Sequence, residues 1–174
     1  MKFLHILNIV EDTIVDGPGF RTTIYSSGCP HRCPGCHNPQ SWNMKNGHPE
    51  SIDVIFERIK NNPIANVTFS GGEPFMQVVG FTALAKRIKK ETSKTIWCYT
   101  GYLYEELLKN EQHKELLSYL DVLVDGHFEQ ELKDEDLRFR GSSNQRIIRL
   151  NKQLSLKIEP LVDKAFLEAS FMCV

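Results

Sequence analysis

The amino-acid sequence predicts a single α/β domain with a mainly parallel β-sheet. Segments rich in β-branched and aromatic residues alternate along the chain with segments whose apolar residues recur at helical spacing. Such alternation is typical of β-α-β units, in which right-handed crossovers place parallel strands side by side. The length of 174 residues and the hydrophobic content of 41% suit one globular domain, and no internal repeat or low-complexity linker divides the chain.

The expected strands are short and are bounded by turn-forming residues. The first, residues 2–10, is mainly apolar. The second, residues 20–27, delivers Gly28 and the first cysteine of a closely spaced group. The strands expected further along the chain are residues 66–69, 95–99 and 121–124, with 147–148 as one more. The sheet is therefore expected to contain five or six strands.

Amphipathic helices are predicted between these strands. Ser51 is a suitable N-cap for the first helix, which should end near residues 61–63, where two asparagines precede a proline. Its apolar residues recur at i, i+3, i+4 and i+7: Ile52, Ile55, Phe56 and Ile59. A second helix is marked by Phe81, Leu84, Ala85 and Ile88, and helical segments are expected at 104–109 and 112–120.

The cysteine pattern points to metal chemistry. Cys29, Cys33 and Cys36 lie within eight residues, and the other two cysteines are remote in sequence. Three thiolates can hold three corners of a cubane iron–sulfur cluster and leave its fourth iron open to a ligand. A structural zinc site with His31 or His37 as the fourth ligand is an alternative. A disulfide with a free thiol is another, although five is an odd number of cysteines and no signal-peptide pattern is present.

Other strand ends carry candidate ligand-binding residues. Gly71 and Gly72 would let a ligand approach the backbone closely, and Glu73 offers a carboxylate for an ammonium group. Asp125 follows the strand at 121–124, where an acid could accept ribose hydroxyl groups. Parallel α/β folds build their sites at the carboxyl ends of the strands, so this clustering of groups indicates a site.

Charge and hydropathy argue against two classes of partner. The formal net charge of −1 gives no overall attraction to nucleic acid or to an anionic membrane. No apolar run approaches the roughly 20 residues of a transmembrane helix, so a cytoplasmic location is expected. Reduced cysteines suit that compartment. Cys98 is most simply a buried apolar residue of its strand, and Cys173 a terminal thiol.

These motifs together resemble those of the radical S-adenosylmethionine enzymes, whose hallmark is Cys-x3-Cys-x2-Cys. The run Asp16–Arg21 ahead of the cysteines, and Cys36-His37-Asn38 continuing to Trp42, are similar to motifs of the activases of glycyl-radical enzymes. The later motifs that fit the activases serving anaerobic (class III) ribonucleoside-triphosphate reductase are residues 99–102, 124–128 and 140–145. The resemblance covers residues 5–150 and is specific because the motifs occur in combination.

The resemblance implies a fold, a cofactor and a reaction. The fold would be an open, partial (β/α) barrel, whose open side suits a substrate that is itself a folded protein. Cys29, Cys33 and Cys36 would ligate a [4Fe–4S] cluster whose open iron takes S-adenosylmethionine. Reductive cleavage of S-adenosylmethionine would give a 5′-deoxyadenosyl radical, which abstracts hydrogen from a glycine of the partner and forms a glycyl radical.

The same resemblance assigns further residues. Contacts to S-adenosylmethionine are expected from Gly35, Cys36, His37, Gly71, Gly72, Glu73 and Asp125. Contacts to a protein partner are expected from Asp16, Gly17, Pro18, Gly19, Arg21 and Arg140. The partners implied are the catalytic subunit of anaerobic ribonucleoside-triphosphate reductase and a low-potential electron donor of the flavodoxin or ferredoxin type.

Two positions depart from the wider pattern, and other functions stay open. Gly35 stands where many radical enzymes have an aromatic residue, so a contact to adenine would come from backbone alone. His127 stands where related activases often have lysine. The alternatives are an activase of the pyruvate formate-lyase type, a radical enzyme acting on a small molecule, and a zinc or electron-transfer module. Residues 1–150 are expected to form the activase domain, and residues 151–174 a C-terminal extension of unknown role packed on the same domain.

Overall fold

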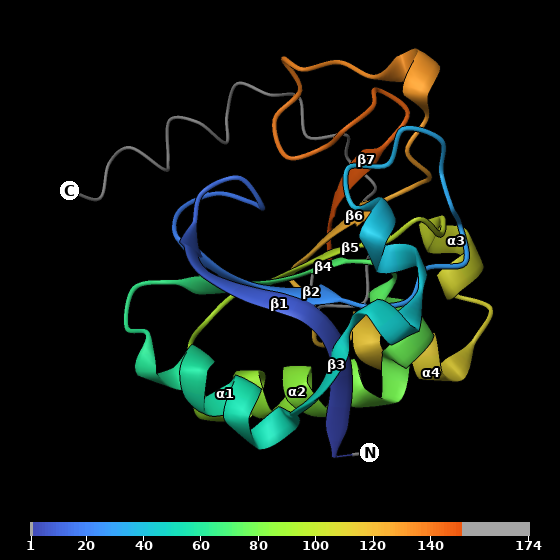
Figure 1. Ribbon diagram of the computed structural model, residues 1–174. Coiled ribbons are helices and arrows are strands. Elements are labelled where there is room, and N and C mark those ends of the chain that lie inside the picture. Colours follow the sequence, from blue (N-terminus) through green and yellow to red (C-terminus); the bar gives the residue numbers. More distant parts are fainter. Residues whose placement is uncertain (1, 151–174) are drawn as a thin grey trace.

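The computed structural model describes residues 2–150, and across this range the strands form one seven-stranded sheet (Figure 1). The strand order is β3-β1-β2-β4-β5-β6-β7. The strands are β1 (Phe3–Thr13), β2 (Arg21–Ser26), β3 (His48–Ser51), β4 (Asn66–Gly71), β5 (Ile96–Tyr99), β6 (Val122–Asp125) and β7 (Arg146–Arg149). The predicted C-terminal extension, residues 151–174, lies outside the described residues.

The centre of the sheet is parallel and its margins are antiparallel. β2, β4, β5 and β6 run in the same direction, and β2 pairs with β4 from Arg21–Asn66 to Ser26–Gly71. β1 pairs antiparallel with β2 and with β3, and β7 pairs antiparallel with β6. The β1–β2 connection is too short for a helical crossover, which explains the antiparallel pairing there. The prediction of an α/β domain with a mainly parallel sheet is confirmed for its central strands.

The helices lie mainly along one face of the sheet (Figure 1). The α-helices are α1 (Ile52–Asn61), α2 (Val78–Glu91), α3 (Tyr104–Leu107) and α4 (Glu111–Leu117), and the short 3₁₀ helices are η1 (Pro39–Trp42), η2 (Met44–Asn46), η3 (Pro74–Gln77) and η4 (Gln130–Leu132). α1 buries the four apolar residues that predicted it, and Ser51 caps it by accepting a hydrogen bond from the Asp53 backbone N–H at 3.3 Å.

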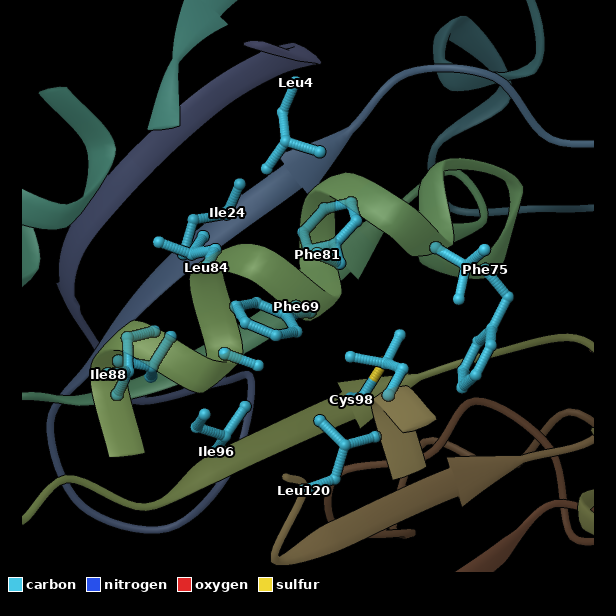
Figure 2. Close-up of a cluster of buried hydrophobic side chains, with 14 of the residues drawn as sticks. Leu4, Ile24, Phe69, Phe75, Phe81, Leu84, Ile88, Ile96, Cys98 and Leu120 are labelled. Atoms are coloured by element: carbon cyan, nitrogen blue, oxygen red, sulfur yellow. The ribbon is translucent and has the colours of Figure 1, made fainter. Parts of the chain in front are cut away.

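The hydrophobic core fills the space between these helices and the sheet (Figure 2). Ile24, Phe69 and Cys98 lie on three neighbouring strands and face α2, where Phe81 and Leu84 meet them. The ring centroids of Phe69 and Phe81 are 4.8 Å apart. Burial raises the pKa of the Cys98 thiol well above its usual value, so this cysteine is the neutral core residue that its strand position predicted.

The opposite face of the sheet carries a smaller apolar cluster. Trp97, Val122 and Val124 are buried there, and the ring of Phe139 packs edge-on against Trp97 with 5.7 Å between centroids. Phe139 belongs to the long connection between β6 and β7, which borders this face together with the β1–β2 loop. None of the helices within residues 2–150 combines the length and the apolar character that crossing a membrane requires.

Candidate metal centre and its cavity

The three clustered cysteines lie in the loop that follows β2. Cys29, Cys33 and Cys36 are half-buried free thiols. Backbone hydrogen bonds tie the loop to η1, because the Gly28 N–H donates to Ser41 O at 2.7 Å and the Cys29 N–H donates to Trp42 O at 3.2 Å. The strand β2 therefore sets the position of Cys29, and the 3₁₀ helix η1 fixes the loop through these hydrogen bonds.

Backbone N–H groups surround the thiols. The Asn38 N–H donates to Cys36 Sγ at 3.4 Å. Burial raises the pKa of Cys29, while hydrogen bonds from the His31 and Arg32 backbone partly oppose that rise. Donors of this kind favour thiolates, and hydrogen bonds to sulfur are one of the protein's means of tuning an iron–sulfur cluster.

Residues 2–150 do not assemble the alternative site for a single zinc ion. Within residues 2–150 no three His, Cys, Asp or Glu side chains converge closely enough to hold one metal ion. Cysteines of a cubane bind different irons and so lie farther apart than ligands of one ion. The histidines considered for zinc have other contacts: His31 Nε2 meets Glu73, and the His37 ring packs near Phe128 at 5.4 Å. The donor set is three thiols on one loop, which matches three corners of a [4Fe–4S] cluster.

The glycines after β4 bring backbone close to the cysteine loop. Gly71 has a φ of +93°, and a Cβ atom there would lie 2.6 Å from Ser26 N. A Cβ atom on Gly72 would lie 2.4 Å from Gly28 O. Neither position can take a side chain without moving backbone, so both glycines are needed for β2 and β4 to end side by side.

Glu73 is completely buried and fully engaged with protein groups. Its carboxylate accepts hydrogen bonds from the Phe75 N–H at 3.0 Å, the Thr100 hydroxyl at 3.0 Å and the Gly101 N–H at 2.9 Å. The fourth contact is His31 Nε2 at 2.9 Å. The predicted contact between Glu73 and a cofactor ammonium stays a prediction, and it would require one of these donors to be exchanged.

Asp125 is likewise buried and paired. Its carboxylate accepts a hydrogen bond from the Tyr104 N–H at 2.7 Å and another from Arg146 Nε at 2.9 Å. Arg146 also pairs with Glu105, and this pairing lowers the pKa of Glu105. Asp125 therefore ties β6 to β7 and α3, and its predicted contact to the cofactor stays a prediction.

A cavity of about 380 Å³ opens beside the cysteine loop. Five of the predicted site residues line it: Asp16, Cys36, His37, Gly71 and Arg140. Ser70, Tyr99, Phe128 and Phe139 also line it, and sequence reasoning missed them as site residues. Tyr99 alternates with the core residue Cys98 along β5, which is the signal that could have placed it on the cavity face. A larger hollow of about 710 Å³ is lined by residues of the β1 end and α1, and none of the three clustered cysteines contributes to it.

The loop of residues 13–20 presents Asp16 to this cavity. The Tyr25 hydroxyl donates to Asp16 Oδ2 at 2.6 Å, and burial together with this bond raises the pKa of Tyr25. Gly17 is buried beneath the loop surface, whereas Pro18 is half-buried and Gly19 exposed. The loop is therefore positioned at the cavity, but only part of it faces solvent.

Arg21 is only 1% exposed, and its predicted contact to a protein partner stays a prediction. Its guanidinium donates to Thr68 Oγ1 at 2.6 Å and to Pro18 O at 3.3 Å, and lies 5.5 Å from the Trp97 ring centroid. Burial lowers its pKa to about 10, so it is still a cation at neutral pH. The side chain of Arg21 thus holds the loop of residues 13–20 in place through its bond to Pro18. Arg140 is half-buried, and it donates from Nη1 to Gln145 O at 3.1 Å.

Fold and site together define an α/β iron–sulfur protein, with free thiols at the end of a parallel strand. The comparison with protein families agrees, since residues 15–148 match the family described as a 4Fe-4S single cluster domain. Among curated proteins, the anaerobic ribonucleoside-triphosphate reductase-activating protein of Salmonella typhi is 42% identical over 140 residues, covering 76% of this chain and 90% of the relative. The chain belongs to the family of anaerobic ribonucleoside-triphosphate reductase-activating proteins.

Two further relatives show the breadth of this family. The protein of the same name from Escherichia coli K12 is 41% identical over 140 residues, covering 76% of this chain and 90% of the relative. The one from Enterobacteria phage T4 is 33% identical over 141 residues, covering 76% of this chain and 86% of the relative. The family predicted from the motifs is therefore confirmed.

Proposed function

We propose that this chain activates an anaerobic ribonucleoside-triphosphate reductase by forming a glycyl radical on its catalytic subunit. The observation that carries the proposal is the meeting of the three-cysteine loop with the Gly71 turn at one cavity. The names of the relatives support the choice of partner. The chain is thus a radical S-adenosylmethionine enzyme of the glycyl-radical activase class.

The cofactor would be held by residues of the cysteine loop, the Gly71 turn and the end of β6, of which Cys36, His37 and Gly71 line the cavity. Cys29, Cys33 and Cys36 would ligate the [4Fe–4S] cluster, and contacts to S-adenosylmethionine would come from Gly35, Cys36, His37, Gly71, Gly72, Glu73 and Asp125. When bound and reduced by one electron, this pair supplies a 5′-deoxyadenosyl radical with loss of methionine, and the radical takes one hydrogen atom from glycine.

The protein's own residues orient the reactants and exclude water. The Gly71–Gly72 turn keeps side chains out of the space beside the cysteine loop. The aromatic residues Tyr99, Phe128 and Phe139 line the cavity and limit solvent access, which protects a reactive species. The partner's glycine must approach closely, because efficient transfer needs near-contact geometry. We place that approach beside Asp16–Gly19 and Arg140.

Three finer assignments belong to the same proposal. The sheet would be an open, partial (β/α) barrel of the radical S-adenosylmethionine type, because its helices lie mainly on one face and the cavity on the other. The electron would come from a low-potential flavodoxin or ferredoxin, and the protein would act in the cytoplasm. Residues 1–150 would be the activase domain.

The test is electron paramagnetic resonance under strict anaerobiosis. The reconstituted chain is mixed with a strong reductant, S-adenosylmethionine and the reductase, and 5′-deoxyadenosine is assayed in parallel. The expected result is a glycine-centred doublet on the reductase that is absent when this chain is omitted. Cleavage of S-adenosylmethionine without the doublet would contradict the choice of partner, and about one zinc per chain with no sulfide would contradict the cluster.

A further inference from the structure

The buried carboxylate of Glu73 joins the ends of several strands around the cysteine loop. It follows β4 directly, and it accepts hydrogen bonds from Thr100 and Gly101, which follow β5. Its contact with His31 reaches into the segment between Cys29 and Cys33. One side chain therefore fixes the cysteine loop relative to two neighbouring strand ends.

The His31 side chain is also buried, and it packs against two other rings. Its side chain is only 7% exposed, and its ring meets those of Tyr102 and His127 edge-on, each at 4.5 Å between centroids. The imidazole donates the bond to Glu73, because an ionised carboxylate can only accept. A Cβ atom on Gly101 would lie 2.4 Å from the His31 ring, so the glycine makes room for the imidazole.

The carboxylate of Glu73 lies close to the cysteine loop, because it contacts His31 between Cys29 and Cys33. No lysine or arginine within residues 2–150 pairs with this carboxylate, and its solvation comes from neutral donors. A buried charge at this position acts on the neighbouring cysteine loop more strongly than it would in water.

We propose that Glu73 and His31 are a positioning pair for the metal centre, with His31 fixing the Cys29–Cys33 segment and Glu73 placing a buried negative charge beside it. The inference rests on the proposed cluster and gives Glu73 a structural role in addition to its predicted contact with the cofactor's ammonium group. Net charge near a cluster and hydrogen bonds around its ligands set its reduction potential and its retention.

The pair predicts separate effects for its two members. His31→Ala removes the link to the cysteine loop, and we expect about 10-fold weaker retention of iron and sulfide through anaerobic gel filtration. His31→Gln should restore most of the retention, because the amide can still donate to the carboxylate. Glu73→Gln removes one negative charge, so the midpoint potential of the cluster should become less negative.

The experiment measures iron, sulfide and midpoint potential in the full-length chain. His48→Gln and Glu57→Gln are matched controls on the exposed surface, and both should behave like the parent. A parent without iron and sulfide would overturn the proposed function itself. If the parent protein does contain iron and sulfide, either of two results overturns the proposed positioning pair. One is unchanged iron retention in His31→Ala, and the other is an unchanged midpoint potential in Glu73→Gln. Both hold whatever happens to the affinity for S-adenosylmethionine. Should Glu73→Gln fail to fold by circular dichroism, iron retention in the two His31 variants decides.

Discussion

Buried polar side chains near the cavity act mainly on the backbone of their own protein. Arg21 and Asp125 carry opposite charges and lie on different strands, and both use those charges to hold neighbouring segments. Each was expected from the sequence to contact a ligand or partner. Motif membership locates such residues at the site, and their burial and hydrogen bonds show that they also hold neighbouring segments of the protein.

The three clustered cysteines should be separable from Cys98 by mutation. Cys29→Ala, Cys33→Ala and Cys36→Ala should each abolish cleavage of S-adenosylmethionine, measured as 5′-deoxyadenosine formed with a strong reductant. Cys98→Ala should retain cleavage, because this thiol faces the core on the other side of the sheet. Its cost should be about 1 kcal/mol of unfolding free energy.

Loss of cleavage in Cys98→Ala, in protein that still unfolds cooperatively, would contradict the three-cysteine assignment. Cys173→Ala is expected to retain cleavage as well, although that residue lies outside the described part of the chain.

Removing the Arg21 side chain should destabilise the whole domain. Arg21→Met would leave the backbone oxygens of Pro18 and Val67 without their buried donor, and we expect a loss of about 3 kcal/mol in unfolding free energy. Urea denaturation followed by circular dichroism measures it. Arg58→Met, at an exposed ion pair, is the control and should cost well under about 1 kcal/mol. Equal urea midpoints for Arg21→Met and Arg58→Met would contradict the stabilising role of the buried Arg21 side chain.

At the scale of elements, the site depends on how strands end rather than on the strands themselves. β2 ends at the cysteine loop, β4 at the Gly71 turn, and β5 at Thr100–Gly101. The parallel register aligns these ends, with Ser26 opposite Gly71. The ends of strands far apart in the sequence therefore meet at the site, and the long β6–β7 connection adds Phe139 and Arg140 to the cavity.

Helix capping gives an element-scale prediction. Asn110 begins α4, and its side-chain oxygen accepts hydrogen bonds from the Gln112 N–H at 2.8 Å and the His113 N–H at 3.3 Å. Asn110→Ala should lower the unfolding free energy by about 1 kcal/mol. Thermal unfolding of the variant checks this, with Glu115→Ala in the exposed part of the same helix as a near-neutral control.

The elements that sequence could predict are those whose patterning is local. The apolar stripe of α1 and the β-branched and aromatic residues of β5 are visible without neighbours, and both elements were predicted. β3 was missed, because His48–Ser51 contains a proline and no apolar alternation and becomes a strand only by pairing with β1. The same limit applies to the site. The spacing of the three clustered cysteines identifies them from the sequence, whereas Tyr99 and Phe139 line the cavity because distant segments pack together.

For the whole molecule, the seven-stranded sheet is formed within residues 2–150. β7 closes the order at one edge, and Leu150 donates a backbone hydrogen bond to Asp121 O at 2.9 Å just after it. No strand of the site lies beyond this point in the described chain.

A chain ending at residue 150 should therefore fold and load its cluster. We expect cooperative urea unfolding and the same iron and sulfide per chain as the full-length protein. Circular dichroism and iron analysis after anaerobic reconstitution measure the two quantities. A shortened chain that unfolds without cooperativity would show that residues 151–174 belong to the domain, contrary to the proposed boundary.

The three clustered cysteines are synthesised before β4 and β5, the strands whose ends will lie beside them. All three thiols leave the ribosome with β1 and β2, before β4 exists to pair with β2 or to supply Glu73. Parallel pairing of this kind is non-local and forms slowly. The newborn chain therefore carries all three clustered thiols while the strand ends that will shelter them are still missing. During that interval the thiols are open to oxidation and to the wrong metal, so cluster insertion belongs after folding.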